Sequence, residues 1–276
     1  ATCTVVYDRS PAHLIGQRGE GFKYMLLLMN NARLGVGFEG LGTCEAAYRM
    51  SRDYAAERVS MGKTIDRHEM IADYLDEMKT DVQAIRALTI TATEYNELAQ
   101  RAETHLMTKS YKNEAERKEY EAIMKRYKRK ARRLTPLLKY YGAEKPVDMS
   151  RRAMQIHGGV GYTKEYGAEK LLRDALVLPI YEGTSQIQAL MATKDELLGM
   201  TKDPARALRR AAKARWASMT SSDRHERQMG KLQTVADQAR LKLMAKVLGY
   251  KVKDLGAADF PKLASHFKSW DVKKDF

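Results

Sequence analysis

The sequence predicts a mainly α-helical protein built on a bundle of long helices. Gly and Pro are scarce, at 18 and 6 of the 276 residues, whereas Ala, Leu, Met, Lys, Arg and Glu are abundant, and this balance favours helix over sheet. Apolar residues also recur three and four positions apart over long stretches, as they do on the buried face of a helix. A chain of this length can form one large domain or two smaller ones.

The first part of the chain is expected to hold one strand and two long helices. Residues 2–15 alternate and are rich in β-branched side chains, which predicts a strand that meets a turn at residues 16–21. The apolar period then predicts a helix over residues 22–58, which Met61-Gly62-Lys63 ends. A second helix, with one apolar stripe, is predicted from about residue 68 to residue 103.

Later helices are expected from their start and stop signals. Pro146-Val147-Asp148 predicts a helix start, because Pro fits the first turn and a carboxylate favours the N-terminal end of a helix. The glycines from Gly158 onward predict its end. A short amphipathic helix is expected over residues 165–176, another over residues 184–199, and a basic helical tail of some seventy residues after Pro204.

Half of the net charge of +14 lies in one segment, residues 109–133, which holds eleven Lys or Arg and four Glu. Its acids and bases interleave at helical spacings such as Glu121 and Lys125, and this arrangement is typical of a solvated helix face. The alternative is an electrostatic surface for a polyanion, which could be RNA, a membrane or a partner protein.

The remaining composition limits the class of protein. No apolar run approaches the roughly 20 residues that cross a bilayer, so no transmembrane segment is expected. The two cysteines, Cys3 and Cys44, have no metal-binding spacing and are too few for a disulfide scaffold. A reducing compartment, either the bacterial cytoplasm or the mitochondrial matrix, is therefore expected.

The chemistry is concentrated in residues 154–188, MQIHGGVGYTKEYGAEKLLRDALVLPIYEGTSQIQ. A glutamine-led glycine turn is followed, about twenty residues later, by a Tyr-Glu-Gly-Thr turn. This segment closely resembles the C-terminal signature of the acyl-CoA dehydrogenases. The resemblance implies the C-terminal four-helix bundle of that fold at residues 19–200, preceded by a β-strand remnant of the middle β-domain at residues 1–18 and followed by a helical extension at residues 201–276.

The resemblance also implies a catalytic base. Glu182 matches the glutamate that removes the α-proton of an acyl-CoA thioester while the β-hydrogen leaves as hydride to FAD, with the enolate stabilised in part by the glutamate's own backbone N–H. Without the surrounding signature, Glu182 would be interpreted as an exposed turn residue. The same resemblance places Tyr181, Gly183, Asn30 and Arg33 at the substrate. Asn30 stands where many members have an aspartate.

The flavin contacts are carried over in the same way. Glycines let the main chain approach a pyrophosphate, and a guanidinium is well suited to pair with one. In the family, the glycine turn meets the flavin of the neighbouring subunit. Met61 and Glu69 depart from the family's usual Phe and Gln. No metal site is expected, and the implied FAD contacts are Arg58, Ser60, His68, Gln155, Gly158, Gly159, Thr184 and Gln186.

The details are most similar to the larger members of the family, including enzymes that resemble 3-methylmercaptopropionyl-CoA dehydrogenase. The parts that would cover the flavin ring and most of the acyl-CoA have no counterpart here. The chain is therefore expected to be a fragment of a protein about twice as long, or to need a second chain, and to work as a homo-oligomer that passes electrons to an electron-transferring flavoprotein. A nucleic-acid partner is not expected. The rival is a non-catalytic basic helical scaffold for a polyanion or partner protein.

Overall fold

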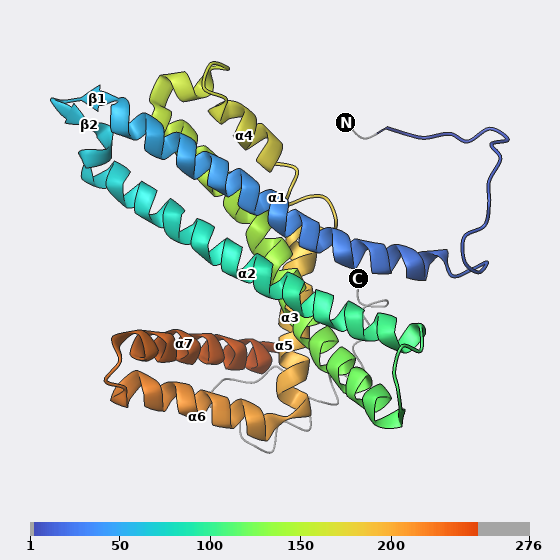
Figure 1. Ribbon diagram of the computed structural model, residues 1–276. Helices are drawn as coiled ribbons and strands as arrows, with labels where there is room; N and C mark the ends of the chain where they lie inside the picture. Colours follow the sequence, from blue (N-terminus) through green and yellow to red (C-terminus); the bar gives the residue numbers. More distant parts are fainter. Residues whose placement is uncertain (1–2, 248–276) are drawn as a thin grey trace. The chain divides into compact units, whose positions relative to one another are not determined.

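The computed structural model describes residues 3–247, and the end of the predicted basic tail lies outside the described residues. The chain divides into two compact units, residues 1–188 and residues 189–276. Most of the described residues are helical, which confirms the predicted fold class (Figure 1).

Unit 1 is dominated by three long helices that pack along one another (Figure 1). A small hairpin and a 3-10 turn connect the first two helices, and a second 3-10 turn and a short helix follow the third. The elements in chain order are α1 (Gly21–Glu57), β1 (Val59–Ser60), β2 (Lys63–Thr64), η1 (Ile65–Arg67), α2 (Glu69–Met107), α3 (Glu114–His157), η2 (Gly158–Tyr162), α4 (Ala168–Ala175) and the start of α5 (Ser185–Lys202).

The main core of unit 1 lies where α1, α2 and α3 meet. It combines small residues, which let the helix backbones approach, with larger apolar side chains that fill the space between them. Full burial of each large side chain contributes about 1.5–3 kcal/mol. The buried residues of this core are Cys44, Ala47, Ala55, Met78, Val82, Ile85, Met149, Ala153 and Ile156.

The predicted helix start at residues 146–148 is wrong, because α3 runs unbroken from Glu114 to His157 with Pro136 and Pro146 inside it. A proline removes the hydrogen bond to the carbonyl four residues earlier, which for Pro146 is that of Gly142. This carbonyl faces α1: a Cβ built on Gly40 would lie 1.8 Å from the Gly142 oxygen. Tertiary packing of α3 against α1 therefore keeps the helix continuous across a residue that local rules place at its start.

The break after α1 is confirmed, and its form is a tight hairpin. Val59 pairs with Thr64 and Ser60 with Lys63, and the two residues between the strands, Met61 and Gly62, have φ of 49° and 81°. Two successive positive φ angles are those of the turn that best matches the twist of a two-residue hairpin. The hairpin itself was not predicted, because only Gly62 carries a turn signal.

The predicted strand at residues 2–15 is absent among residues 3–15, which are exposed and adopt no regular structure. A strand needs a neighbour for its N–H and C=O groups, and no described segment of this chain pairs with these residues. The first two turns of α1 are also exposed, although they carry Phe22, Leu27 and Leu28 at 68%, 60% and 70% exposure. The described part of the chain thus leaves an apolar surface uncovered at the start of α1.

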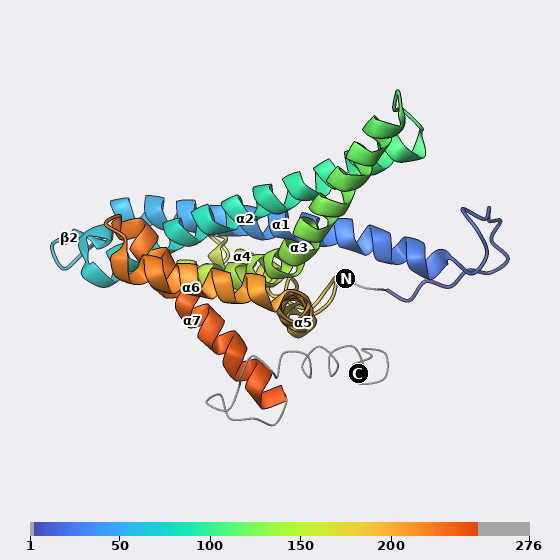
Figure 2. The same cartoon turned by 90° about the horizontal axis from the view of Figure 1, so that it is seen from below.

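The basic segment occupies the turn after α2 and the first half of α3, where the two helices extend away from α1 (Figure 2). Arg117 pairs with Glu114 and Glu121 on its own helix, and Lys128 pairs with Glu103 on α2. These contacts agree with the predicted solvated face. Within residues 3–247, no helix combines the length and apolar character that crossing a membrane requires.

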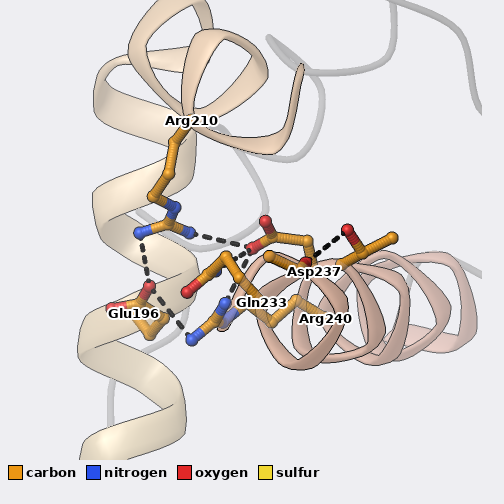
Figure 3. A network of polar contacts seen from close by, with 7 residues as sticks. Glu196, Arg210, Gln233, Asp237 and Arg240 are labelled. Carbon is orange, nitrogen blue, oxygen red and sulfur yellow. Dashed lines mark hydrogen bonds and ion pairs between the residues drawn. The ribbon is translucent and has the colours of Figure 1, made fainter. Parts of the chain in front are cut away.

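The described part of unit 2 contains the rest of α5, α6 (Pro204–Thr220) and α7 (Arg224–Val247). A polar network joins these three helices (Figure 3). The buried Asp237 carboxylate accepts from Arg210 at 3.2 Å, Gln233 at 3.0 Å and Arg240 at 2.7 Å, and Glu196 accepts from Arg210 at 3.1 Å. Because each buried charge has an opposite partner, the network can be buried without stranding an unpaired ion.

Candidate active site

Glu182 lies in an irregular turn between α4 and α5. Helix α4 ends at Ala175, Pro179 prevents its continuation, and the N–H of Ser185 closes the turn on the Pro179 carbonyl at 3.0 Å. Glu182 has a φ of 53°, in the left-handed region that a residue with a Cβ rarely adopts, and Gly183 follows with a φ of 89°. A strained backbone of this kind persists only where surrounding contacts impose it.

Two side chains impose this conformation by binding the carbonyl of Glu182. Arg33 on α1 donates from Nε at 3.2 Å, and Gln188 on α5 donates from Nε2 at the longer distance of 3.5 Å. Arg33 is 9% exposed and Gln188 is fully buried, so both donors are fixed by packing. Arg33 also donates to the side chain of Asn30 at 3.2 Å. The predicted substrate residues Asn30, Arg33 and Gly183 are thus brought together with Glu182.

The backbone of Glu182 is held, but its carboxylate is not. The Glu182 Oε2, Ser185 Oγ and Gln188 Oε1 atoms are buried and have no hydrogen-bond partner among the described residues. Native proteins rarely leave buried polar atoms unpaired unless a ligand or a chemical role explains them. These three oxygens belong to the segment from Glu182 to Gln188, and each can accept a hydrogen bond, while the carboxylate of Glu182 can also accept a proton.

Two buried cations adjoin the turn. Burial lowers the pKa of the Arg33 guanidinium, and the Glu182 carboxylate acts in the opposite direction. Burial, followed by the positive charge of Arg33, lowers the pKa of the Lys139 ammonium group on α3. The Lys139 Nζ donates to the carbonyl of Leu178 at 2.8 Å. The surroundings of Glu182 are therefore positively charged and partly withdrawn from water.

The neighbours of Glu182 in sequence have separate partners. The Tyr181 hydroxyl donates to Glu39 of α1, and burial followed by this bond raises the pKa of the phenol. Thr184 accepts from the N–H of Ile187 at 3.4 Å and so caps α5. Gln186 is exposed. Of the predicted flavin residues, only Thr184 and Gln186 lie beside Glu182.

Three predicted flavin residues lie at the hairpin that follows α1. His68 is half-buried, and its Nε2 lies 3.1 Å from the Ser60 carbonyl, which joins the start of α2 to β1. The Arg58 side chain is exposed, while its backbone N–H bonds the Tyr54 carbonyl and ends α1. The Arg58 guanidinium is thus presented to solvent at a rigid helix end.

The glycine turn lies at the same end of unit 1, because the His157 ring stacks on Tyr54 with 4.4 Å between ring centroids. Gln155 is exposed, and a Cβ on Gly158 or Gly159 would meet nothing within 4 Å. Only Gly161 is required by internal packing, since its Cβ would lie 2.7 Å from the Met154 carbonyl. Gly158 and Gly159 therefore expose bare backbone to solvent, and this surface fits the close approach of a pyrophosphate.

The structure thus separates the predicted flavin residues into two groups. In Figure 1, the loop between α4 and α5 lies beside α1, whereas β1 and β2 lie at its far end. From Arg33 to Arg58, α1 advances roughly 35–40 Å. The group at the far end contains Arg58, Ser60, His68, Gln155, Gly158 and Gly159.

Sequence reasoning missed three residues that contact the turn from the helices around it: Lys139, Gln188 and Glu39. Gln188 closes the signature segment, but its burial could not be predicted from its place there. Lys139 lies in an apolar stretch between Leu138 and Tyr140, and Glu39 lies between Phe38 and Gly40, but no sequence motif connects either residue to the turn. Within residues 3–247, no group of three or more His, Cys, Asp or Glu side chains is placed to hold a metal ion.

Comparison with known proteins identifies the family to which this chain belongs. The family model of the acyl-CoA dehydrogenase C-terminal domain matches residues 19–125 and 118–197. The chain is 31% identical over 222 residues to 3-methylmercaptopropionyl-CoA dehydrogenase of Ruegeria pomeroyi, covering 76% of this chain and 34% of that protein. It is 32% identical over 203 residues to an acyl-CoA dehydrogenase of Bacillus subtilis, covering 72% of this chain and 46% of that protein.

A solved structure shows the same relationship. Butyryl-CoA dehydrogenase from Megasphaera elsdenii is 26% identical to this chain, with a TM-score of 0.50 over 66% of this chain and 40% of that one. The chain spans less than half the length of each of these three relatives. On this evidence, the chain belongs to the acyl-CoA dehydrogenase family and contains its C-terminal domain.

Proposed function

We propose that this chain is the catalytic C-terminal part of an FAD-dependent acyl-CoA dehydrogenase, which converts an acyl-CoA thioester to the 2-enoyl-CoA with Glu182 as the base. The observation that carries the proposal is the buried, unpartnered Oε2 of Glu182 on a strained turn whose backbone is held by Arg33 and Gln188. A carboxylate oxygen that accepts nothing from the protein is available to accept a proton from a substrate.

Each residue of the turn has a distinct part in the proposed reaction. Arg33 and Gln188 hold the Glu182 carbonyl, so the carboxylate starts from a fixed position. Glu182 Oε2 takes the α-proton, and the backbone of the turn at Gly183, whose missing side chain leaves room for Gln188, approaches the thioester. When bound, FAD supplies the acceptor for the β-hydride. Arg33 stays charged while Glu182 is neutralised, and this favours the negative charge that develops on the substrate.

The far-end group supports a second part of the proposal. Arg58, Gln155 and the open backbone at Gly158 and Gly159 fit the pyrophosphate of FAD in chemistry and in exposure. Because this group lies far from Glu182 along α1, we assign it to the cofactor of a second copy in a homo-oligomer. The exposed apolar side chains at the start of α1, Phe22, Leu27 and Leu28, support a further protein surface that packs there.

The partners and compartment follow the family resemblance. We assign the electrons to an electron-transferring flavoprotein, and we assign the protein to the bacterial cytoplasm. The match to a bacterial acyl-CoA dehydrogenase and the two free cysteines support the assignment to the bacterial cytoplasm.

The test uses the assembled enzyme, that is, the holoenzyme with FAD bound. Acyl-CoA is added without an electron acceptor, and the flavin absorbance is followed. The wild type is expected to bleach, and Glu182→Gln is expected to keep its flavin and bleach at least about a thousandfold more slowly. Glu169→Gln, the same chemical change on α4, is the matched control and should bleach like the wild type. Wild-type bleaching rates in Glu182→Gln would overturn the assignment of the base.

A further inference from the structure

Lys139 is a fully buried lysine on α3, at 0% exposure, to which the proposed chemistry gives no role. Burying an ammonium ion is strongly unfavourable unless good partners surround it. Its hydrogen-bond partner is a backbone carbonyl, that of Leu178, and not a carboxylate. A buried charged side chain that binds the main chain of a distant segment is expected to hold that segment in position.

The bonded carbonyl is the one at which the turn begins. Leu178 follows the end of α4 and precedes Pro179, whose missing N–H ends the helical hydrogen-bond pattern. Because the chain leaves the helical path after Pro179, no backbone N–H of the described residues bonds the Leu178 carbonyl, and Lys139 Nζ supplies a donor at 2.8 Å. From this point the chain runs through only three residues to Glu182.

Lys139 contacts the turn at a second point. Its Nζ lies 5.8 Å from the ring centroid of Tyr181, within the range of a cation–π interaction. Tyr181 is in turn bound through its hydroxyl to Glu39. Contacts from α3 thus fix the turn on the amino-terminal side of Glu182, as Arg33 and Gln188 fix the Glu182 carbonyl.

We propose that Lys139 is a positioning residue, whose bond to the Leu178 carbonyl holds the amino-terminal side of the turn so that Glu182 keeps its strained backbone and its place. The inference rests on the proposed role of Glu182 as the base. The charged groups that act on the ammonium are Arg33, Glu144 and Glu182, so its charge and that of Glu182 are also coupled. The lowered pKa of Lys139 agrees with its burial beside Arg33.

The experiment is hydrogen exchange, read by mass spectrometry, on the full chain with Lys139→Met. Methionine fills nearly the same volume and is suited to burial, so the loss should act mainly on the turn, where the Leu178 carbonyl is left without its donor. Amides of residues 178–185 should exchange about tenfold to a hundredfold faster, because a hydrogen bond from a charged donor is lost. Lys145→Met is the matched control on the same helix, since it removes an ion pair with Asp81 and should leave residues 178–185 unchanged.

Two outcomes would overturn the proposal. One is unchanged exchange in residues 178–185; the other is lower global stability with all helices affected alike, which would make Lys139 an ordinary core residue. In the assembled enzyme, Lys139→Met should lower kcat by about tenfold or more while KM and bound flavin stay near the wild type. If even the wild type fails to bleach, the proposed function fails, whereas the exchange result still decides whether Lys139 holds the turn.

Discussion

The two halves of α3 differ in the burial of their charged side chains. In residues 114–133, charged side chains lie at the surface and pair with partners one turn away or on α2, as Arg117 does with Glu114 and Glu121. In residues 134–157, Lys139 is buried against a backbone carbonyl, and Lys145 is half-buried against Asp81 at 2.8 Å. One continuous helix thus carries a solvated face and a packed face in succession.

The difference shows which charges are expected to matter. An exposed ion pair contributes little to stability, because water screens the attraction and two long side chains lose conformational freedom. A buried polar group must keep its partner, because its loss leaves an unsatisfied group in a low dielectric. The packed half of α3 also requires small residues where the helices cross, so its sequence is constrained at nearly every turn. Changes in the packed half should therefore have large effects, and changes in the solvated half small ones.

The largest effect is expected at the crossing of α1 with the packed half of α3. In Gly40→Ala, the new Cβ would lie 1.8 Å from the Gly142 carbonyl oxygen, so one helix backbone must shift. We expect the free energy of unfolding to fall by about 3 kcal/mol or more. Thermal unfolding followed by circular dichroism would measure it. Gly42→Ala, where a Cβ meets nothing within 4 Å, should instead gain about 0.5–1 kcal/mol. Equal stability of the two variants would show that the helices do not cross so closely.

An intermediate effect is expected from Cys44 at alkaline pH. Burial, and then the charge of Asp81, raise the pKa of this thiol from 9.0 to about 12. Between these values the unfolded chain ionises and the folded one does not, so this contribution to stability is complete below about pH 9 and is lost as the pH rises toward about 12. Lys139, whose pKa is lowered, acts in the opposite direction.

Comparison with Cys44→Ala separates the two groups. Urea unfolding of the wild type and the variant would be measured at several values between about pH 8 and 10. The wild type should lose stability more steeply with rising pH than the variant does. Parallel curves would show that the Cys44 thiol does not contribute.

The smallest effect is expected in the solvated half of α3. Arg117→Ala removes the pairs with Glu114 and Glu121, but both partners remain hydrated. The thermal midpoint should not change beyond experimental error, and any change should disappear at high salt. A loss as large as that of Gly40→Ala would contradict the distinction between the two halves.

Much of the fold could be predicted because local signals agreed with the tertiary structure. The periodic apolar residues predicted α1 and α2, and the glycines predicted the end of α3 at His157. Local signals gave wrong predictions where long-range contacts determine the structure. Pro146 is locally a helix start, yet the crossing of α3 over α1 holds the helix through it. Residues 3–15 have strand composition but no described partner strand.

The candidate site shows the same division. The predicted proximity of Arg33 to Glu182 is observed, while the roles of the site residues stay predictions. The gathering of the flavin residues into two separated groups could not be predicted, because a motif gives residue types and spacings but not the direction in which a helix carries them. The same holds for Gln188 and Lys139, whose importance comes from burial.

The sequence by itself determined the helical class, the main helix boundaries and the family signature around Glu182, since these depend on residues close together along the chain. Only the tertiary structure decided that Lys139 is buried under the turn, that Gly40 must lack a side chain, and that Arg33 and Gln188 bind one carbonyl. These facts depend on which faces of separate helices meet. Helix packing buries one lysine and leaves a similar one exposed, and residue type alone carries no record of that choice.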